Sequence, residues 1–181
     1  VYVTNPNNPT GSILSEEAMQ RIVTRCEEMG AYLISDEVYI GSELRQEQTM
    51  SFWGMSECVI ITSGLSKAYG ILGVRIGWIV GNKNLVHECW TQHDYITIGP
   101  NKISDIIARA AVKQENRAAL YARTKKILKN NLLVMMDWLQ SFNDFFTFHP
   151  TEGGAFCFPK YKPDIPSYEI CKAILEKQNT L

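Results

Sequence analysis

Short apolar runs and longer amphipathic stretches alternate along the first third of the chain. Residues 1–4, 32–35 and 58–62 are apolar runs bounded by turn residues, which is typical of buried strands. Between the first two runs, residues 16–29 carry apolar side chains at helical spacing behind Ser15, a residue type that caps helices. A strand, a helix and a strand in this order predict a right-handed βαβ unit with parallel strands.

The rest of the chain is predicted to contain one more strand of this sheet, then mainly helices and a small mixed unit. One glycine, Gly77, punctuates residues 75–80, where we expect a strand that reverses direction. A change in composition near residue 141 indicates the start of the small unit. We expect helices at 82–95, after Pro100 and at about 117–140, strands at 145–148 and 155–158, and a final helix capped by Ser167 with Ile170, Ala173 and Ile174 facing inward.

Two polar stretches are predicted to face solvent. Residues 40–57 show no clear period and predict a loop, which Phe52 and Trp53 anchor to the core. The helix at 117–140 has an apolar face and a basic face. Because the chain is nearly neutral, we interpret the basic face as solvated rather than as a nucleic-acid site; it consists of Arg123, Lys125, Lys126 and Lys129.

The overall composition is that of an ordinary globular protein. The chain has 181 residues, of which 45% are hydrophobic and 20% charged, with a net charge of −1 and a pI of about 6.3. This balance argues against nucleic acid or a membrane as a partner, and no apolar run approaches the roughly 20 residues of a membrane span. Five scattered cysteines without a CxxC pair, and three histidines without partners at ligand spacing, predict a cytoplasmic protein with reduced thiols and no metal site.

The stretch from Ser63 to Trp78 has the residue types of a cofactor site. Lys67 lies among apolar residues, and burial lowers the pKa of an amine, which makes it a nucleophile for Schiff-base chemistry. Arg75 stands between two glycines, where a guanidinium suits a phosphate. With the hydroxyl groups of Ser63 and Ser66, these groups indicate a phosphorylated carbonyl cofactor. The alternative is an exposed lysine and a structural arginine in a glycine-rich turn.

Two other strands of the predicted sheet also end in polar residues. Residues 5–11 form a turn cluster rich in Asn, Pro and Gly, and its amide groups follow the first strand. Asp36 follows the second strand, where a carboxylate can face a cationic ligand atom; the alternative is a helix cap or a loop charge. Because the carboxyl ends of parallel strands share one edge, we expect Asn8, Asp36 and Tyr39 to lie near Lys67.

In order and spacing, these segments resemble the fold-type I pyridoxal-phosphate enzymes, specifically the class I and II aminotransferases related to aspartate aminotransferase. The matching motifs are Asn-Pro-x-Asn-Pro-Thr-Gly from Asn5, Asp-Glu-Val-Tyr from Asp36 and Ser-x-x-Ser-Lys-x-x-Gly-x-x-Gly-x-Arg-x-Gly from Ser63. They span residues 5–77, and weaker similarity continues at 152–156. The resemblance implies an α/β fold, with a three-layer, mostly parallel sheet and flanking helices, plus part of a small α+β C-terminal domain.

The resemblance also implies a domain organisation. Residues 1–98 would belong to the large domain that binds pyridoxal 5′-phosphate, residues 99–140 would be helices that link the domains, and residues 141–181 would begin the small domain. In the family, a phosphate-binding turn and a ring-stacking aromatic precede the Asn-Pro motif, and a carboxylate-binding arginine lies near the C-terminus. No arginine follows Arg123, so we expect this chain to be part of a longer enzyme and unable to turn over at a normal rate alone.

The resemblance implies a role for each residue that matches a motif. Lys67 would form a Schiff base with the cofactor aldehyde and later carry the proton between the substrate Cα and the cofactor. Asp36 would pair with the pyridine nitrogen and keep it protonated, which makes the ring an electron sink. Asn8 and Tyr39 would hydrogen-bond the phenolic oxygen and keep it anionic.

The same resemblance implies that Arg75 binds the cofactor phosphate. A hydroxyl group from Ser63 or Ser66 would add a hydrogen bond there. Many relatives carry Ser or Thr three positions before the lysine, whereas this chain has Gly64. The motif therefore leaves the choice between the two serines open.

The function that the resemblance implies is amino-group transfer between an amino acid and a 2-oxo acid, by a homodimer. Phe52, Trp53 and Tyr95 are candidates for contact surfaces in such a dimer. The same motifs also occur where the reaction is β-elimination or cyclisation, because the ring chemistry is shared until the carbanion forms. A lyase, a cyclising synthase and an inactive cofactor-binding remnant are therefore the alternatives.

Overall fold

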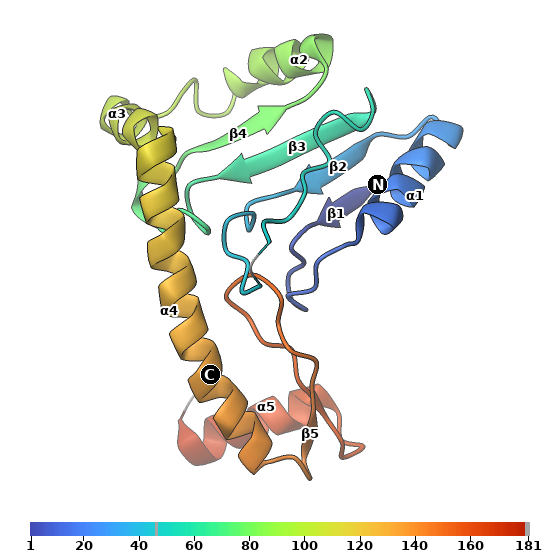
Figure 1. Cartoon of the computed structure of the whole chain (residues 1–181), viewed down its shortest axis with the longest axis vertical. Coiled ribbons are helices and arrows are strands. Elements are labelled where there is room, and N and C mark those ends of the chain that lie inside the picture. Colours follow the sequence, from blue (N-terminus) through green and yellow to red (C-terminus); the bar gives the residue numbers. More distant parts are fainter. Residues whose placement is uncertain (46, 180–181) are drawn as a thin grey trace.

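The computed structural model describes residues 1–45 and 47–179. A four-stranded sheet forms one part of the molecule, and a long helix leads from it to a smaller part that holds the C-terminal residues (Figure 1). The first three strands are parallel and the fourth is antiparallel, which confirms the predicted mostly parallel sheet with a reversed last strand. In spatial order the strands are β1 (Tyr2–Thr4), β2 (Leu33–Asp36), β3 (Val59–Gly64) and β4 (Gly77–Val80).

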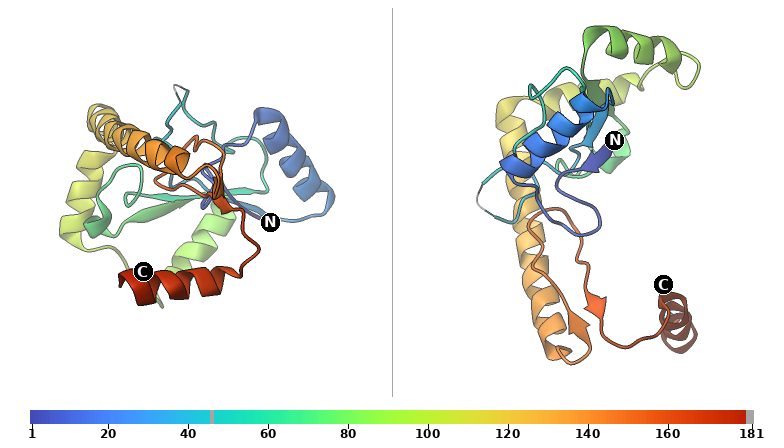
Figure 2. Two further views of the ribbon diagram at one scale, coloured as in Figure 1. Left: turned by 90° about the horizontal axis from the view of Figure 1, so that it is seen from below. Right: turned by 90° about the vertical axis from the view of Figure 1, so that its right-hand side faces the viewer.

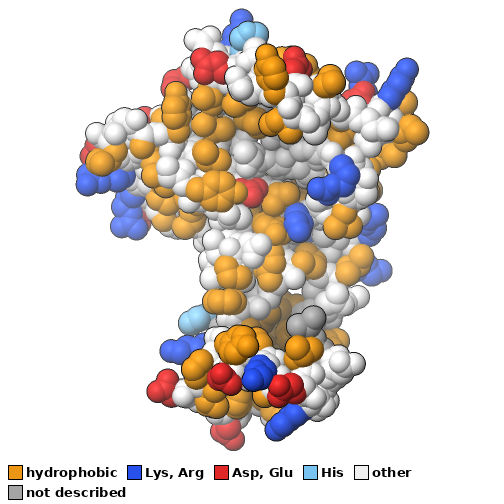
Figure 3. Space-filling view, turned by 180° about the vertical axis from the view of Figure 1, so that it is seen from behind, with side chains coloured by type: hydrophobic (Ala, Val, Ile, Leu, Met, Phe, Trp, Pro, Cys, Tyr) orange, Lys and Arg blue, Asp and Glu red, His pale blue; other side chains and the backbone are white. Residues whose placement is uncertain are grey.

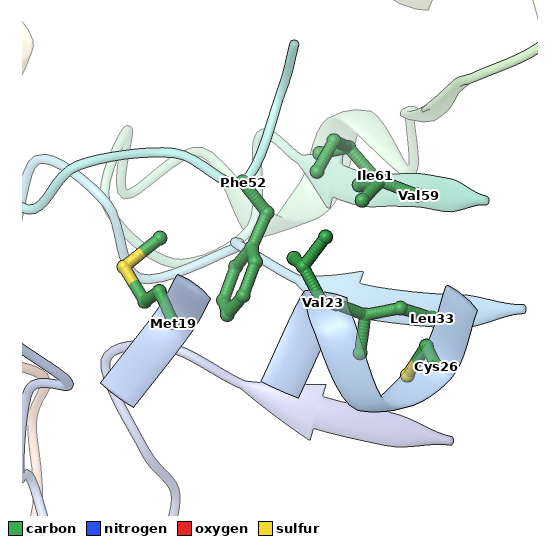
Figure 4. Close-up of a cluster of buried hydrophobic side chains, with 7 residues drawn as sticks. All are labelled: Met19, Val23, Cys26, Leu33, Phe52, Val59 and Ile61. Atoms are coloured by element: carbon green, nitrogen blue, oxygen red, sulfur yellow. The ribbon is translucent and has the colours of Figure 1, made fainter. Parts of the chain in front are cut away.

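Helix α1 (Glu16–Glu28) joins β1 to β2 and packs against the sheet. Its start is set by Ser15, whose hydroxyl oxygen accepts a hydrogen bond from the Ala18 N–H at 3.2 Å, and it ends at Gly30, which adopts a φ of +61°. Both ends were predicted. Burying each large apolar side chain of this core contributes about 1.5–3 kcal/mol. The core consists of Met19, Val23, Cys26, Leu33, Phe52, Val59 and Ile61 (Figure 4).

The two faces of the sheet differ in how well they are covered. Helix α1 and the long helix α4 (Gln114–Ser141) lie on one side, and α2 (Lys83–His93) lies on the other (Figure 2). Side chains of β2 and β3 that face α1 are buried, whereas Ile34 and Ile60 on the opposite face are only half-buried.

The helices after β4 leave much apolar surface exposed. Helix α2 has no buried side chain, and α3 (Lys102–Ala111) buries only two alanines. Tyr95, between these helices, is 88% exposed. Hydrophobic side chains also gather over the sheet-bearing part on the face seen in Figure 3. Trp53 is exposed as well, so the prediction that it anchors its loop to the core is wrong; Phe52 alone does so, and being fully buried it cannot form a contact surface.

The C-terminal part differs from the prediction in detail. A strand pair forms between β5 (Phe146–Thr147) and β6 (Lys160–Tyr161), so the strand predicted at 155–158 is wrong. The physical reason is that the preceding residues bond elsewhere: the N–H groups of Glu152 and Gly153 both donate to the Gly11 carbonyl oxygen, at 3.0 and 2.9 Å.

Helix α5 (Ser167–Gln178) follows this strand pair. It begins at Ser167 with Pro166 in the capping position, so the predicted cap is wrong by one residue. The helix has no buried side chain, and the prediction that its apolar residues face inward is therefore also wrong for this chain. The period of the helix was visible in the sequence, but within the described residues no other element buries its side chains.

Two of the four basic side chains on α4 bind other segments. The prediction of a solvated face is wrong for Lys125, which is partly buried, whereas Arg123 is exposed as predicted. Lys125 Nζ lies 2.9 Å from Oε2 of Glu43, whose side chain is fully buried. Arg123 donates to two backbone carbonyl groups that follow β3. Lys126 and Lys129 are exposed, as predicted.

Glu43 links the loop after β2 to α4. Its Oε1 accepts hydrogen bonds from the N–H groups of Gly41 at 2.9 Å and Thr49 at 3.1 Å. Burial by itself raises the pKa of the Glu43 carboxyl, but the bonds from Gly41, Lys125 and Thr49 outweigh it and hold this pKa below its usual range. The carboxylate is therefore ionised and paired at neutral pH.

Replacing Lys125 by methionine is expected to lower the free energy of unfolding by about 3 kcal/mol at neutral pH, because a buried carboxylate loses its cation. The native pKa of Glu43 is lowered, so its contribution is present above the unfolded-state pKa of about 4.3 and is lost as the pH falls through the native value. The difference between the two proteins should then narrow below about pH 4. Urea denaturation of the complete protein at several pH values measures this.

The matched control is Lys126→Met on the same helix, where the side chain is exposed. It should change the free energy of unfolding by no more than about 0.5 kcal/mol. Equal losses of unfolding free energy in both variants would show that the ion pair between Lys125 and Glu43 does not stabilise the fold.

Candidate functional site

The predicted site residues meet at one open cavity on the carboxyl edge of the sheet. The cavity has a volume of about 580 Å³ and is formed by the ends of β2 and β3 and by the turn after β1. This is the edge at which open α/β sheets bind ligands. Its lining includes every predicted site residue: Asn8, Asp36, Tyr39, Ser63, Ser66, Lys67 and Arg75.

Asp36 is the last residue of β2, and both of its carboxylate oxygens are held. Oδ1 accepts a hydrogen bond from the Val38 N–H at 3.2 Å, and Oδ2 accepts one from the Tyr2 hydroxyl group at 2.9 Å. Partial burial and the nearby Asp36 carboxylate raise the pKa of Tyr2, so its phenol stays protonated and donates. The orientation of the Asp36 carboxylate is thereby set.

Tyr2 was not among the predicted site residues, although the sequence held a signal for it. Thr4 pairs with Asp36 in the sheet, and Tyr2 lies two residues earlier on the same strand. Side chains two residues apart point to the same face of a strand, and the phenol is long enough to reach the carboxylate. The signal depends on the register between β1 and β2, which the sequence did not reveal.

Asn8 and Tyr39 form a second pair at the cavity wall. Asn8 Nδ2 donates to the Tyr39 hydroxyl oxygen at 3.3 Å. Tyr39 is buried, and its ring packs edge-on against Phe156 with 4.8 Å between ring centroids. Because Asn8 supplies a proton to this oxygen, the hydroxyl hydrogen of Tyr39 is left to point to another acceptor.

Lys67 is exposed, so the prediction of a desolvated amine is wrong for this chain. Its neighbours Leu65, Ala68 and Tyr69 are buried and form the base of the segment, but they do not cover the lysine. Lys67 instead lines both the cavity described above and an adjacent one of about 570 Å³. The position of the amine matches the prediction, and its solvation matches the alternative of an exposed lysine.

Arg75 lies outside the strand that was predicted to contain it. It follows the short 3₁₀ helix η1 (Leu72–Val74) and adopts a left-handed φ of +56°. A residue other than glycine in this region costs of order 1–3 kcal/mol, which surrounding contacts must offset. Nη1 of Arg75 donates to Leu72 O at 3.1 Å and to Ser66 Oγ at 3.3 Å.

The two serines play different parts. Ser66 Oγ stands beside the Arg75 guanidinium. Ser63 Oγ donates to the Glu37 backbone carbonyl oxygen at 3.3 Å and so ties β3 to the end of β2. Both line the cavity, but only Ser66 is joined to the cationic group.

Glu37 is a buried carboxyl group that the sequence analysis missed. Its Oε1 accepts hydrogen bonds from the Phe52 N–H at 2.8 Å and from Ser35 Oγ at 3.2 Å, and its Oε2 accepts one from Ser51 Oγ at 2.7 Å. Burial raises the pKa of Glu37 in spite of these bonds. The side chain fixes the backbone next to Asp36 by tying it to the loop that carries Phe52.

This set of groups fits pyridoxal 5′-phosphate. Lys67 supplies an amine for an aldehyde, and Asp36 supplies an oriented carboxylate for a ring nitrogen. Tyr39 supplies a hydroxyl donor for a phenolic oxygen, and Arg75 with Ser66 supplies donors for a phosphate. All of these side chains line one cavity.

Other kinds of site are not seen in the described residues. Over residues 1–45 and 47–179, no cluster of three or more His, Cys, Asp or Glu side chains is arranged to hold a metal ion. No helix in this part of the chain combines the length and the hydropathy that a membrane crossing needs. The cysteines are all free thiols.

Comparison with known proteins adds independent findings. The sequence profile of the family described as aminotransferase class I and II matches residues 1–180. The valine–pyruvate aminotransferase of Mycobacterium tuberculosis is 33% identical over 141 residues, which are 73% of this chain and 36% of that protein.

Two solved structures of PLP-dependent enzymes also match this chain. A PLP-dependent aminotransferase from Streptococcus suis matches 99% of this chain and 47% of its own chain, with a TM-score of 0.88 and 26% identity. A PLP-dependent cyclase matches 100% of this chain and 49% of its own, with a TM-score of 0.86 and 25% identity. The chain spans less than half the length of each of these proteins.

Proposed function

This chain belongs to the class I and II aminotransferase family, and on that premise we propose that the complete protein moves an amino group between an amino acid and a 2-oxo acid. The family uses pyridoxal 5′-phosphate, and the cavity at the sheet edge is the site that we assign to it. The observation that carries this proposal is the convergence of the predicted site residues from three separate strand ends on one cavity.

Lys67 has the central role in this proposal. When bound, the cofactor supplies an electron-accepting ring that stabilises negative charge on the substrate Cα. The Lys67 amine would condense with the aldehyde carbon with loss of water, would be released when a substrate amine takes its place, and would then move a proton between the substrate Cα and the former aldehyde carbon. The exposure of Lys67 between two cavities leaves it room to do both.

Asp36, Tyr39 and Asn8 orient the ring and set its charge. The Asp36 carboxylate, held by Val38 and Tyr2, keeps a proton on the ring nitrogen. The Tyr39 hydroxyl hydrogen, which the bond from Asn8 directs away from that amide, is donated to the phenolic oxygen.

Arg75 and Ser66 bind the phosphate in this proposal, and Ser63 does not. Replacing Ser66 by alanine is expected to weaken cofactor binding about tenfold, since it removes one hydrogen bond to a charged group. Ser63→Ala is the matched control and should change the dissociation constant less than about twofold, because Ser63 Oγ is bonded to a backbone carbonyl group instead. Absorbance titration of the complete protein with pyridoxal 5′-phosphate measures both constants. A larger effect of Ser63→Ala would reverse the assignment.

The experiment that tests the function has two readouts. Borohydride reduction of the cofactor-loaded protein, followed by peptide mapping, should place the cofactor on the peptide that contains Lys67. Single amino acids, added in turn to the loaded protein, should then change the cofactor absorbance and release 2-oxo acids. A loaded protein that shows neither an adduct nor a spectral change would support the inactive remnant and reject the proposal.

One observation favours a second candidate, a cyclising enzyme. The similarity to the PLP-dependent cyclase covers the whole of this chain, and the site residues serve either reaction. The products separate the candidates: transfer consumes a 2-oxo acid, cyclisation forms a ring without one, and β-elimination releases ammonia and a 2-oxo acid with no acceptor present.

We also propose that the complete protein is a homodimer. Tyr95 and Ile98 lie in a connection between α2 and α3 that is almost wholly exposed, and Ile103 continues the apolar surface on α3. Apolar surface of this kind is typical of protein contacts. The mass of the complete protein in solution tests this, and a monomer would contradict it.

A further inference from the structure

The turn that follows Lys67 is held by an arginine more than fifty residues away. The Gly70 N–H donates to the Lys67 carbonyl oxygen at 2.9 Å and closes the turn. Arg123 Nη2, from α4, donates to the carbonyl oxygens of Tyr69 at 2.8 Å and Gly70 at 3.2 Å. Within residues 1–45 and 47–179, no other side chain donates to these two oxygens. The conformation just after Lys67 thus depends on α4.

The turn is shaped to receive this arginine. Gly70 adopts a left-handed φ of +66°, and a Cβ atom there would lie 2.7 Å from Arg123 Nη2. A side chain at this position would therefore displace the guanidinium group as well as strain the backbone. Glycine at this position leaves room for the guanidinium group beside the turn.

A second contact of α4 supports the same segment. The ring of Tyr121 packs against the ring of Tyr69, with 5.0 Å between centroids. The Tyr121 ring also lies close to Gly41, where a Cβ atom would be 2.4 Å from the ring. Helix α4 therefore contacts both loops that carry site residues, the one after β2 and the one after β3.

Arg123 and Lys67 also share the wall of one cavity. The cavity of about 570 Å³ next to the proposed cofactor site is lined by both side chains and by Leu72, Ile127 and Leu128. A shift of the turn would also shift the Lys67 backbone, because the Gly70 N–H is bonded to the Lys67 carbonyl oxygen. Arg123 is thus placed to control where the Lys67 amine lies.

We propose that Arg123 is a positioning residue for Lys67: its hydrogen bonds to the Tyr69 and Gly70 carbonyl oxygens hold the turn and thereby direct the amine toward the cofactor. This inference rests on the proposed role of Lys67. It assigns no chemistry to Arg123 itself, which acts only through the backbone that it holds.

Hydrogen exchange in the cofactor-free complete protein tests the structural step. In Arg123→Met, the amides of Gly70 and Ile71 should exchange about tenfold faster, because the bonds from Gly70 N–H to Lys67 O and from Ile71 N–H to Leu65 O open more often. The amide of Ile61, in the centre of β3, should keep its rate. Lys126→Met, on the same helix, should leave all three unchanged.

Trapping with pyridoxal 5′-phosphate tests the functional step. In Arg123→Met, the rate at which borohydride-reducible cofactor appears on Lys67 should fall about tenfold, and the pH at which the bound cofactor changes its absorbance should shift, since both depend on where the amine lies. Arg123→Lys should recover part of the rate, because an ammonium group can still donate to a carbonyl oxygen. Gly70→Ala should reproduce the loss with the arginine intact.

The outcomes separate this inference from the proposed function. Unchanged exchange at Gly70 and Ile71 in Arg123→Met would overturn the positioning role alone. Faster exchange that extends to Ile61 would also overturn it, because Arg123 would then support the fold as a whole. Failure to trap cofactor on Lys67 in the unchanged protein would overturn the proposed function, whatever the exchange rates are.

Discussion

Replacing Lys67 by alanine is expected to lower the rate of the proposed amino-group transfer by the complete protein by up to about 10,000-fold, because the variant loses the group that we propose moves the proton at the substrate Cα. It also loses the amine to which we assign the bond with the cofactor. The cofactor should still bind, since Asp36, Arg75 and Ser66 remain at the cavity, but borohydride should no longer fix it to the protein. Single-turnover kinetics and protein mass after reduction measure the two effects.

Two further measurements sharpen this prediction. A small primary amine added to Lys67→Ala should recover part of the rate, because it can carry the proton in the space that the side chain has left. Lys67→Arg should remain inactive, since a guanidinium group keeps the charge without a usable free base. Lys126→Ala is the matched control on an exposed lysine. A Lys67→Ala protein within tenfold of the unchanged rate would remove Lys67 from the reaction.

Replacing Asp36 by asparagine is expected to lower the turnover rate about 1,000-fold, because an amide does not supply the negative charge that we propose keeps the ring nitrogen protonated. The fold should be preserved: asparagine oxygen can still accept the Val38 N–H, and its amide nitrogen can donate to the Tyr2 hydroxyl oxygen. The loss should therefore appear in the turnover rate rather than in the melting temperature.

A change in the cofactor checks the cause of this loss. A pyridoxal 5′-phosphate analogue methylated at the ring nitrogen carries a permanent positive charge, so it should recover part of the Asp36→Asn activity. The matched variant Tyr2→Phe keeps the carboxylate and removes one hydrogen bond to it, so its loss should be nearer tenfold, as for one bond to a charged group. Equal losses in the two variants would indicate that orientation, not charge, is what Asp36 contributes.

The local sequence pattern was sufficient to predict the bounds of those helices and strands whose ends are set by neighbouring residues. The strand and helix bounds from β1 to β3 agree with the predictions within two residues, because Ser15, Gly30 and the turn residues act over a few positions. The motif at 155–158 failed as a strand because residues before it bond to Gly11 and Ser42, far away in the chain. A local apolar pattern contains no information about such a partner.

The main error in the sequence predictions was to overlook that several charged side chains bind other parts of the chain. Glu37 and Glu43 stand in or next to a polar stretch and gave no periodic signal, yet both are buried and bonded to backbone N–H groups. Arg123 and Lys125 looked like part of a solvated face, and each binds a distant segment. For Glu37, Arg123 and Lys125 the partner lies in another segment, which only the folded chain brings near, whereas Glu43 bonds both to Gly41 in its own loop and to Lys125 on α4.

Three motifs in the sequence determined the family and the cofactor class. They also determined which residues meet at one sheet edge, because parallel strands always present their carboxyl ends on the same side. Only the tertiary structure decided that Lys67 is exposed, that Ser66 rather than Ser63 accompanies Arg75, and that Tyr2 holds the Asp36 carboxylate. Solvent exposure and hydrogen-bond partners depend on how separate elements pack, which residue spacing along one element does not specify.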